Sequence, residues 1–146
     1  MPMPDIEQEF VIHAPPDRVY TAIATPQGMD CWWTMTAGGE PVENAVYALG
    51  FGPRFDWRGR VTRAVPGSAF ELVITVADSD WTGTRVTFEL APTGRDATRV
   101  RFSHTGWPVA NQHWRISCYC WALYLRLLRR YVETGEVVPY PKRLDA

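Results

Sequence analysis

Short stretches of alternating apolar and polar residues follow one another along most of this chain, and turn residues separate them. Alternation of this kind is typical of strands with one buried face. It occurs at residues 6–12, 45–51, 55–62, 70–76, 86–90 and 100–104. Several connections are short and rich in glycine, proline or aspartate, such as Pro66-Gly67. Strands joined by tight turns pair antiparallel, so the sequence predicts an antiparallel sheet with one apolar face.

The periodicity changes after Pro108, and from about Val109 to Thr134 apolar residues recur at helical spacing. This predicts one helix of about 40 Å, which Gly135 is suited to end. Its apolar side is expected to include Ile116, Cys120, Tyr124, Leu127, Leu128 and Tyr131, and to be widened by Cys118, Trp121, Leu125 and Val132. We expect this helix to cover the apolar face of the sheet, because no other predicted element is long enough.

Two shorter helices are expected after the first strand. Pro15 and Pro16 suit the first turn of a helix that Thr25-Pro26 then ends. Residues 28–33 read as a second short helix, and Gly38-Gly39 as a turn. The predicted fold class is therefore α+β. A curved antiparallel sheet wraps around a long C-terminal helix, and residues 1–146 form a single domain.

Composition excludes several classes of function. The formal net charge is −1, whereas binding to the phosphates of nucleic acid needs a basic surface. No apolar run reaches the length of a membrane span, and the first residues lack the pattern of a secretory signal. The chain has three cysteines, an odd number that argues against a disulfide framework. We therefore expect a reduced, cytoplasmic protein that binds no nucleic acid.

Motifs for metals, nucleotides and covalent catalysis are not found in the sequence. The histidines are His13, His104 and His113, and none belongs to a zinc-binding spacing. Cys118 and Cys120 are two residues apart on the predicted helix, so their side chains point in different directions. Neither the glycine pattern of a phosphate-binding loop nor that of a nucleophile elbow occurs. We expect no metal and no cofactor.

Aromatic side chains are the most informative part of the composition, since the chain has seven tryptophans. Most are expected in the core, and a subset is expected to leave an apolar slot open for a small molecule. The predicted ligand-binding residues lie on inward strand positions, on the second short helix and on the long helix. They are Trp32, Trp33, Phe51, Trp57, Arg63, Phe88, Phe102, His104, Trp114, Cys118 and Trp121.

Two polar members of this set have alternative interpretations. His104 shares its strand phase with Val100 and Phe102, so it is a candidate acid or base in the cavity. The alternative is a histidine that is hydrogen-bonded to a loop carbonyl beside Gly106. Arg63 shares the phase of Trp57 and would pair with a carboxylate ligand at the cavity mouth. The alternative is a solvated arginine at a strand end.

Two residues near these strands are expected at the surface. Trp81 lies in the polar loop Asp78–Gly83, where an exposed tryptophan would contact a partner or cover the cavity. His113 falls in the first turn of the long helix and is expected to be partly exposed.

Several short stretches recur in this order in one known superfamily. They are Phe10–Tyr20, Thr25–Gly28 leading to Trp32-Trp33, His104–Trp107, and Trp121–Gly135 followed by Pro139–Pro141. With them the chain resembles the helix-grip fold of the birch-pollen-allergen and START-like superfamily, often called SRPBCC. Within it the chain is similar to the family named for the activator of heat-shock protein 90 ATPase. The resemblance implies a ligand pocket but no particular activity, because the superfamily includes lipid carriers, hormone binders and cyclases.

Three functions remain open from the sequence. The first is binding of a small hydrophobic molecule, lipid-like or aromatic, between the sheet and the long helix. The second is a cyclase or dehydratase that uses the same pocket, with His104 as acid and base and Tyr119 or Tyr124 as a second group. The third is a module that activates a chaperone ATPase. The apolar tail at residues 137–141 would pack on its own domain or on a second copy in a homodimer.

Overall fold

The computed structural model describes residues 4–53 and 56–146. Within these residues, seven strands, two short helices, one long helix and a final 3₁₀ helix follow one another. In order they are β1 (Ile6–Ile12), α1 (Pro16–Ala24), α2 (Pro26–Met29), β2 (Thr36–Gly38), β3 (Val46–Gly50), β4 (Asp56–Val65), β5 (Ala69–Val76), β6 (Arg85–Pro92), β7 (Thr98–Thr105), α3 (Gln112–Thr134) and η1 (Tyr140–Asp145). The predicted α+β helix-grip class is confirmed.

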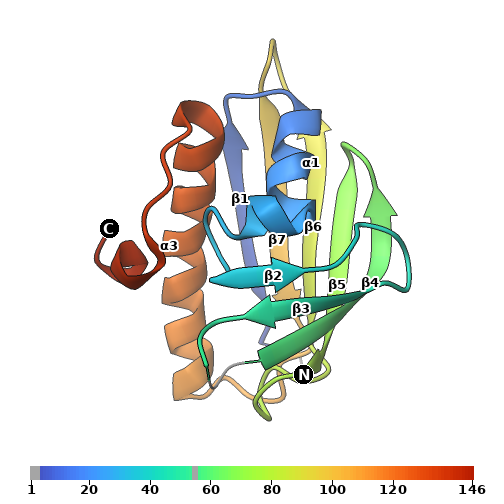
Figure 1. Cartoon of the computed structure of the whole chain (residues 1–146), viewed down its shortest axis with the longest axis vertical. Coiled ribbons are helices and arrows are strands. Elements are labelled where there is room, and N and C mark those ends of the chain that lie inside the picture. Colours follow the sequence, from blue (N-terminus) through green and yellow to red (C-terminus); the bar gives the residue numbers. More distant parts are fainter. Residues whose placement is uncertain (1–3, 54–55) are drawn as a thin grey trace.

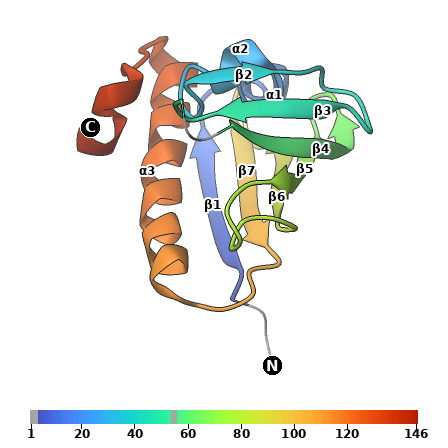
Figure 2. The ribbon, with the colours of Figure 1, turned by 60° about the horizontal axis from the view of Figure 1, so that its bottom comes forward.

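The strands form one antiparallel sheet in the order β1-β7-β6-β5-β4-β3-β2. The sheet is strongly curved: β2 and β3 cross the direction of β1 and β7, while α3 runs beside β1 (Figures 1 and 2). β7 lies between β1 and β6, and Phe102 pairs with Gln8 on one side and with Phe88 on the other. This curvature places the end of β3 and the beginning of β4 near the long helix α3.

Alternation along β7 follows the prediction. Val100, Phe102 and His104 are buried, whereas Arg99 and Arg101 are exposed on the outer face. Of the buried residues of α3, Trp121, Leu125, Leu127, Leu128 and Val132 belong to the predicted apolar side, and Ser117 does not. Ile116, predicted inside, is 51% exposed. The stripe that faces the sheet is therefore shifted toward Trp121, Leu125 and Val132, which were expected to widen the predicted side.

Other element bounds also differ from the prediction. The second helix spans Pro26–Met29, because Thr25 caps it and the chain then turns through Trp32 and Trp33. Gly38, expected in a turn with Gly39, is the last residue of the short strand β2. The long helix α3 begins at Gln112, because the Asn111 side chain accepts a hydrogen bond from the Trp114 amide. Phe55, predicted to begin a strand, lies outside the described residues.

The C-terminal segment packs on its own domain. Arg143, 2% exposed, donates hydrogen bonds to the backbone carbonyls of Val138, Thr34 and Asp30 at 2.9, 3.0 and 2.6 Å. The guanidinium also lies 5.4 Å from the centre of the Tyr140 ring. The tail, for which no regular structure was predicted, thus forms η1 and is held against the segment between α2 and β2. Over residues 4–53 and 56–146, no helix combines the length and apolarity needed to cross a bilayer.

Candidate functional site

A pocket of about 420 Å³ runs along one side of α3. The helix contributes residues at helical spacing from His113 through Ser117 and Cys120 to Tyr124. Seven of the lining side chains are aromatic: Trp33, Phe51, Trp57, Trp81, Trp121, Tyr124 and Tyr140. Because these rings come from loops, strands and helices far apart in the sequence, the pocket exists only in the folded chain.

The aromatic walls are packed against one another. The ring centres of Trp33 and Trp121 are 5.3 Å apart, and those of Phe51 and Trp57 are 5.4 Å apart. Trp57 is in turn 5.0 Å from Trp81. Rings at these separations stabilise one another beyond the burial of their area, so the walls are held in place without a ligand.

The C-terminal segment supplies one wall. Tyr140 lines the pocket, and its hydroxyl donates a hydrogen bond of 3.0 Å to the backbone carbonyl of Phe51. Burial raises the pKa of Tyr140 and raises the pKa of Tyr124 to about 12. Both phenols are therefore neutral near pH 7. They add polar tips without adding charge at this end of the pocket.

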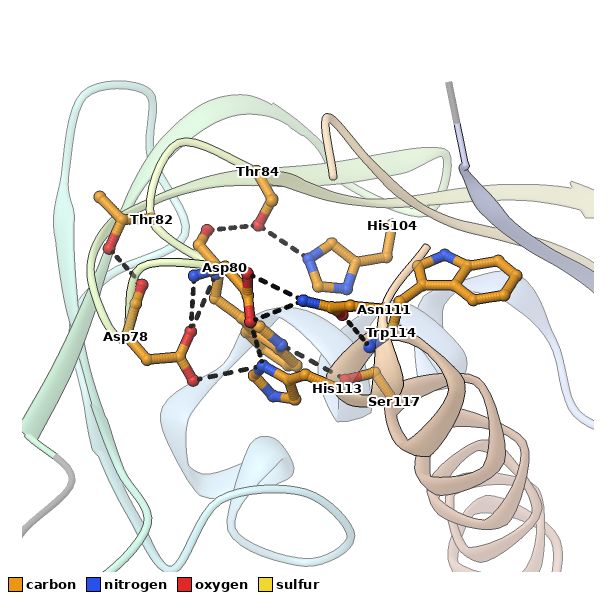
Figure 3. Close-up of polar contacts among 10 residues, drawn as sticks. Asp78, Asp80, Thr82, Thr84, His104, Asn111, His113, Trp114 and Ser117 are labelled. Carbon is orange, nitrogen blue, oxygen red and sulfur yellow. Dashed lines mark hydrogen bonds and ion pairs between the residues drawn. The ribbon is translucent and has the colours of Figure 1, made fainter. Parts of the chain in front are cut away.

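The opposite end of the pocket is acidic (Figure 3). Asp78 Oδ1 accepts hydrogen bonds from the backbone amides of Asp80 and Trp81 at 3.1 and 3.0 Å. His113 Nδ1 lies 3.1 Å from Asp80 Oδ2 and 3.7 Å from Asp78 Oδ2. Asn111 donates from Nδ2 to Asp80 at 3.3 Å. These contacts join the β5–β6 loop to the first turn of α3.

Asp78, Asp80 and His113 also have the donor types that a metal ion prefers, with one atom from each within 4.8 Å of the others. The expectation of no metal rested on spacing along the chain, and spacing does not find this group because His113 lies 33 residues after Asp80. Hydrogen bonds among these side chains and Asn111 already account for the arrangement.

His104 lies behind the pocket wall rather than in the pocket. The ring is fully buried; Nδ1 accepts a hydrogen bond of 3.0 Å from Trp121 Nε1, and Nε2 lies 2.8 Å from Thr84 Oγ1. Because Nδ1 accepts, the proton must be on Nε2, which donates to Thr84. Thr84 Oγ1 then donates to the backbone carbonyl of Trp81 at 2.5 Å. The alternative with a loop carbonyl beside Gly106 is wrong, since both partners are side chains.

This environment determines the charge of His104. Burial, with a further contribution from nearby His113, lowers the pKa of His104 to about 3. The imidazole is therefore neutral near pH 7, and both of its nitrogens are occupied. Its evident role is to connect Trp81 and Trp121, two tryptophans of the pocket wall.

The predicted ligand-binding residues fall into three groups. Trp33, Phe51, Trp57 and Trp121 line the pocket. Four others are buried in the core beside it: Trp32, Phe88, Phe102 and His104. The remaining three lie elsewhere: Arg63 is exposed, Trp114 donates from Nε1 to the carbonyl of Pro4, and Cys118 is a half-buried free thiol.

The position of Arg63 has a specific structural cause. In the pairing of β4 with β5, Val61 is opposite Leu72 but Arg63 is opposite Glu71, so the register shifts at Thr62. A β-bulge of this kind reverses the alternation of side chains beyond it. Val61 and Ala64 consequently face the core, and Arg63 faces the solvent on the outer side of the sheet.

Two tryptophans were misjudged or missed from the sequence. Trp81, predicted as an exposed loop residue, is 8% exposed and lines the pocket. Its ring stacks on Trp121 at 5.9 Å and on His113 at 6.4 Å. Trp107 is fully buried, 5.0 Å from the His104 ring. Neither tryptophan lies in an alternating stretch of the sequence. Their burial is therefore visible only from their contacts with distant parts of the fold. His113 is partly exposed, as predicted.

Comparison with known families identifies the family of the chain. The sequence profile described as "Activator of Hsp90 ATPase homolog 1-like protein" matches residues 13–133, most of the chain. The chain belongs to this family. No curated protein matches it. The family resemblance expected from the sequence is confirmed.

Several solved structures share the fold of this chain. Aha1 from Colwellia psychrerythraea, solved as a dimer, is 26% identical with a TM-score of 0.80, and the match covers 90% of this chain and 98% of that one. MLL2253 from Mesorhizobium loti is 18% identical with a TM-score of 0.80, covering 91% and 99%. CalU16 from Micromonospora echinospora is 19% identical with a TM-score of 0.72, covering 95% and 83%.

Proposed function

We propose that this chain binds a small hydrophobic molecule, aromatic or lipid-like, in the pocket along α3. The observation that supports this most strongly is the lining of seven aromatic side chains around about 420 Å³. Sites for small molecules are typically of this size, mostly apolar, and carry a few placed polar groups. Here the polar groups include Asp78, His113 and the Tyr140 hydroxyl.

The rigidity of the walls supports the same proposal. Trp81 and Trp121 are connected through Thr84 and His104, and Tyr140 is bonded to Phe51. A preformed site loses less conformational entropy when a ligand binds. Family membership is compatible with ligand binding, because the superfamily that the chain resembles is known for a pocket between sheet and helix.

The test is a titration of tryptophan emission with neutral aromatic and alkyl probes, such as 1-methylnaphthalene and decanol. The wild-type protein is expected to show saturable quenching, because several indoles line the pocket. Cys120→Phe places a ring in the pocket and should abolish the signal. Ala122→Phe is the matched control, since Ala122 is exposed on the other side of α3 and should leave binding intact. Failure of every probe to bind the wild-type protein would refute the proposal.

The enzymatic alternative has less support. A cyclase or dehydratase would need His104 to exchange protons with a ligand, yet its ring is fully buried and both nitrogens are occupied. Tyr119, one proposed second group, is exposed and does not line the pocket. Activation of a chaperone ATPase is supported by the family description alone. This alternative would gain support if the protein stimulated a purified Hsp90-type ATPase.

The oligomeric state is a separate proposal. The relative from Colwellia psychrerythraea is solved as a dimer, which supports a homodimer here. The tail that was considered for the dimer contact is partly used within the domain, through Tyr140 and Arg143. Light scattering after size-exclusion chromatography would distinguish a mass of 16.6 kDa from twice that value.

A further inference from the structure

We propose that the ligand of this pocket is an organic cation, with an alkylated ammonium group beside Asp78 and an apolar body along α3. This inference rests on the proposed function, and it names the chemical class of the molecule bound. The carboxylate of Asp78, the tryptophan rings of the lining and the charges around the pocket each contribute to the argument.

The pocket is elongated and its two ends differ. Its lining on α3 extends from His113 to Tyr124, a distance of about 16 Å along the axis. Asp78 and His113 are at one end, and the neutral phenols of Tyr124 and Tyr140 are toward the other. A molecule with one charged end and one apolar end fits this polarity.

The carboxylate at the acidic end is held in a fixed orientation (Figure 3). Its Oδ1 atom is occupied by the amides of Asp80 and Trp81, and the Thr82 hydroxyl donates to the Asp78 backbone carbonyl at 2.8 Å. Oδ2 accepts no hydrogen bond from the described residues, and its one close polar neighbour among them is His113 Nδ1 at 3.7 Å, an ion-pair contact when that ring is protonated. This oxygen has capacity to accept from, or lie against, a positively charged group.

Two indole rings of the pocket lining come from segments beside the carboxylate. Trp81 follows Asp78 in the same loop, and Trp57 is brought beside it because Arg58 of β4 pairs with Val76 of β5. Both rings line the pocket. Aromatic faces carry negative electrostatic potential and attract ammonium groups, with tryptophan the strongest. Aromatic rings recognise quaternary ammonium groups in other proteins, and here a carboxylate lines the same pocket.

The surrounding charges also favour a ligand whose cationic head lies at Asp78. The described residues that line the pocket include neither lysine nor arginine. Asp80 adds a second carboxylate near Asp78. His113 Nδ1 lies 3.1 Å from the Asp80 carboxylate and is the partner of Asp80. Arg143 lies behind Tyr140, at the other end. An anionic head would be repelled at Asp78, whereas a cationic head there is attracted and lies away from Arg143.

The experiment compares a cation with its neutral isostere. The probes are (1-naphthylmethyl)trimethylammonium and 1-neopentylnaphthalene, which differ by one nitrogen in place of carbon, and an anionic third, 1-naphthylmethanesulfonate. Calorimetric or fluorescence titration of the wild-type protein should give at least tenfold tighter binding of the cation than of the isostere. The sulfonate should bind least.

Asp78→Asn keeps the Oδ1 acceptor for the Asp80 and Trp81 amides but removes the charge. The substitution should weaken binding of the cation roughly tenfold and leave the affinity for the neutral isostere unchanged. Glu43→Gln removes one negative charge from an exposed turn and should change neither. If the isostere binds as tightly as the cation, or if the sulfonate binds best, the cation inference is wrong and the proposed function stands. If none of the three probes binds, both are wrong.

Discussion

The guanidinium of Arg143 donates a 2.6 Å hydrogen bond to the backbone carbonyl of Asp30, 113 residues earlier in the chain. Two further bonds reach the carbonyls of Thr34 and Val138. Burial lowers the pKa of Arg143, but a guanidinium titrates so far above neutrality that it stays charged. A buried cation is thus satisfied by backbone dipoles, and it holds the segment that carries Tyr140 into the pocket wall.

Arg143→Met should loosen this segment. It leaves the carbonyls of Asp30 and Thr34 without their donor, and an unsatisfied buried acceptor costs about 1–3 kcal/mol. We expect the free energy of unfolding in urea to fall by that amount and ligand affinity to fall with it. Lys142→Met, at an exposed neighbouring position, is the control and should change neither. Unchanged affinity in Arg143→Met would show that η1 is not needed for the pocket.

Thr84→Val should test the connection between the two pocket tryptophans. The hydroxyl accepts from His104 Nε2 and donates to the Trp81 carbonyl, and valine has nearly the same shape without either function. We expect a loss of about 1–3 kcal/mol in the free energy of unfolding, together with a change in tryptophan emission. Thr36→Val, on exposed β2, provides the comparison and should have little effect. Equal stability of the two variants would contradict the proposed network.

The stability of the protein should decrease in acid because of His104. Its pKa is about 3 in the fold, against an ordinary value of 6.5. The unfolded chain therefore binds a proton below pH 6.5 that the folded protein does not. The free energy of unfolding consequently falls by up to about 1.4 kcal/mol for each pH unit below that value. The contribution of His104 is fully present above pH 6.5 and is lost as the pH falls toward 3.

Urea unfolding at several pH values between 7 and 4 measures this slope, and His104→Gln should reduce it. His13→Gln is the comparison: His13 is 76% exposed and its ion pair with Glu133 lies at the surface, so its loss should change the slope much less than loss of His104. Proton NMR gives a direct readout, because the His104 ring resonances should show no titration between pH 8 and pH 5. A midpoint near 6.5 would contradict the buried neutral ring.

Gly28→Ala should destabilise the junction between α1 and α2. A Cβ atom at this position would be 2.4 Å from the Thr21 carbonyl oxygen and 2.6 Å from that of Ala22. The backbone would have to move, which typically costs about 1–3 kcal/mol for overpacking of this kind. Gly38→Ala is a matched control because no atom lies within 4 Å of the place its methyl group would take, and its backbone is ordinary strand. Comparable melting temperatures for both variants would contradict this close approach.

The sequence was a good guide wherever a regular period extended over many residues. The inward phase of Val100, Phe102 and His104 followed from alternation, and the long helix followed from its spacing. It was a poor guide where a local event changed the period. The bulge at Thr62 turned Arg63 outward, and no pattern of residue types marks that shift.

The loops illustrate the same limit. Asp78–Gly83 reads as a polar exposed turn, yet Trp81 within it is buried between Trp57 and Trp121. The tail has no periodicity, yet Arg143 in it is buried against residues of the first third of the chain. Burial of a single side chain in a loop depends on surfaces that other segments provide, and local spacing does not encode them.

Local spacing by itself determined the strands, the long helix and therefore the layered arrangement of sheet and helix, because hydrophobic periodicity acts between neighbours in the chain. The tertiary structure alone decided where the pocket lies, which tryptophans line it and which charge is at its end. Those features require Asp78, His113 and Tyr140 to line one pocket from positions far apart in the sequence, and only the curvature of the sheet and the docking of η1 achieve this.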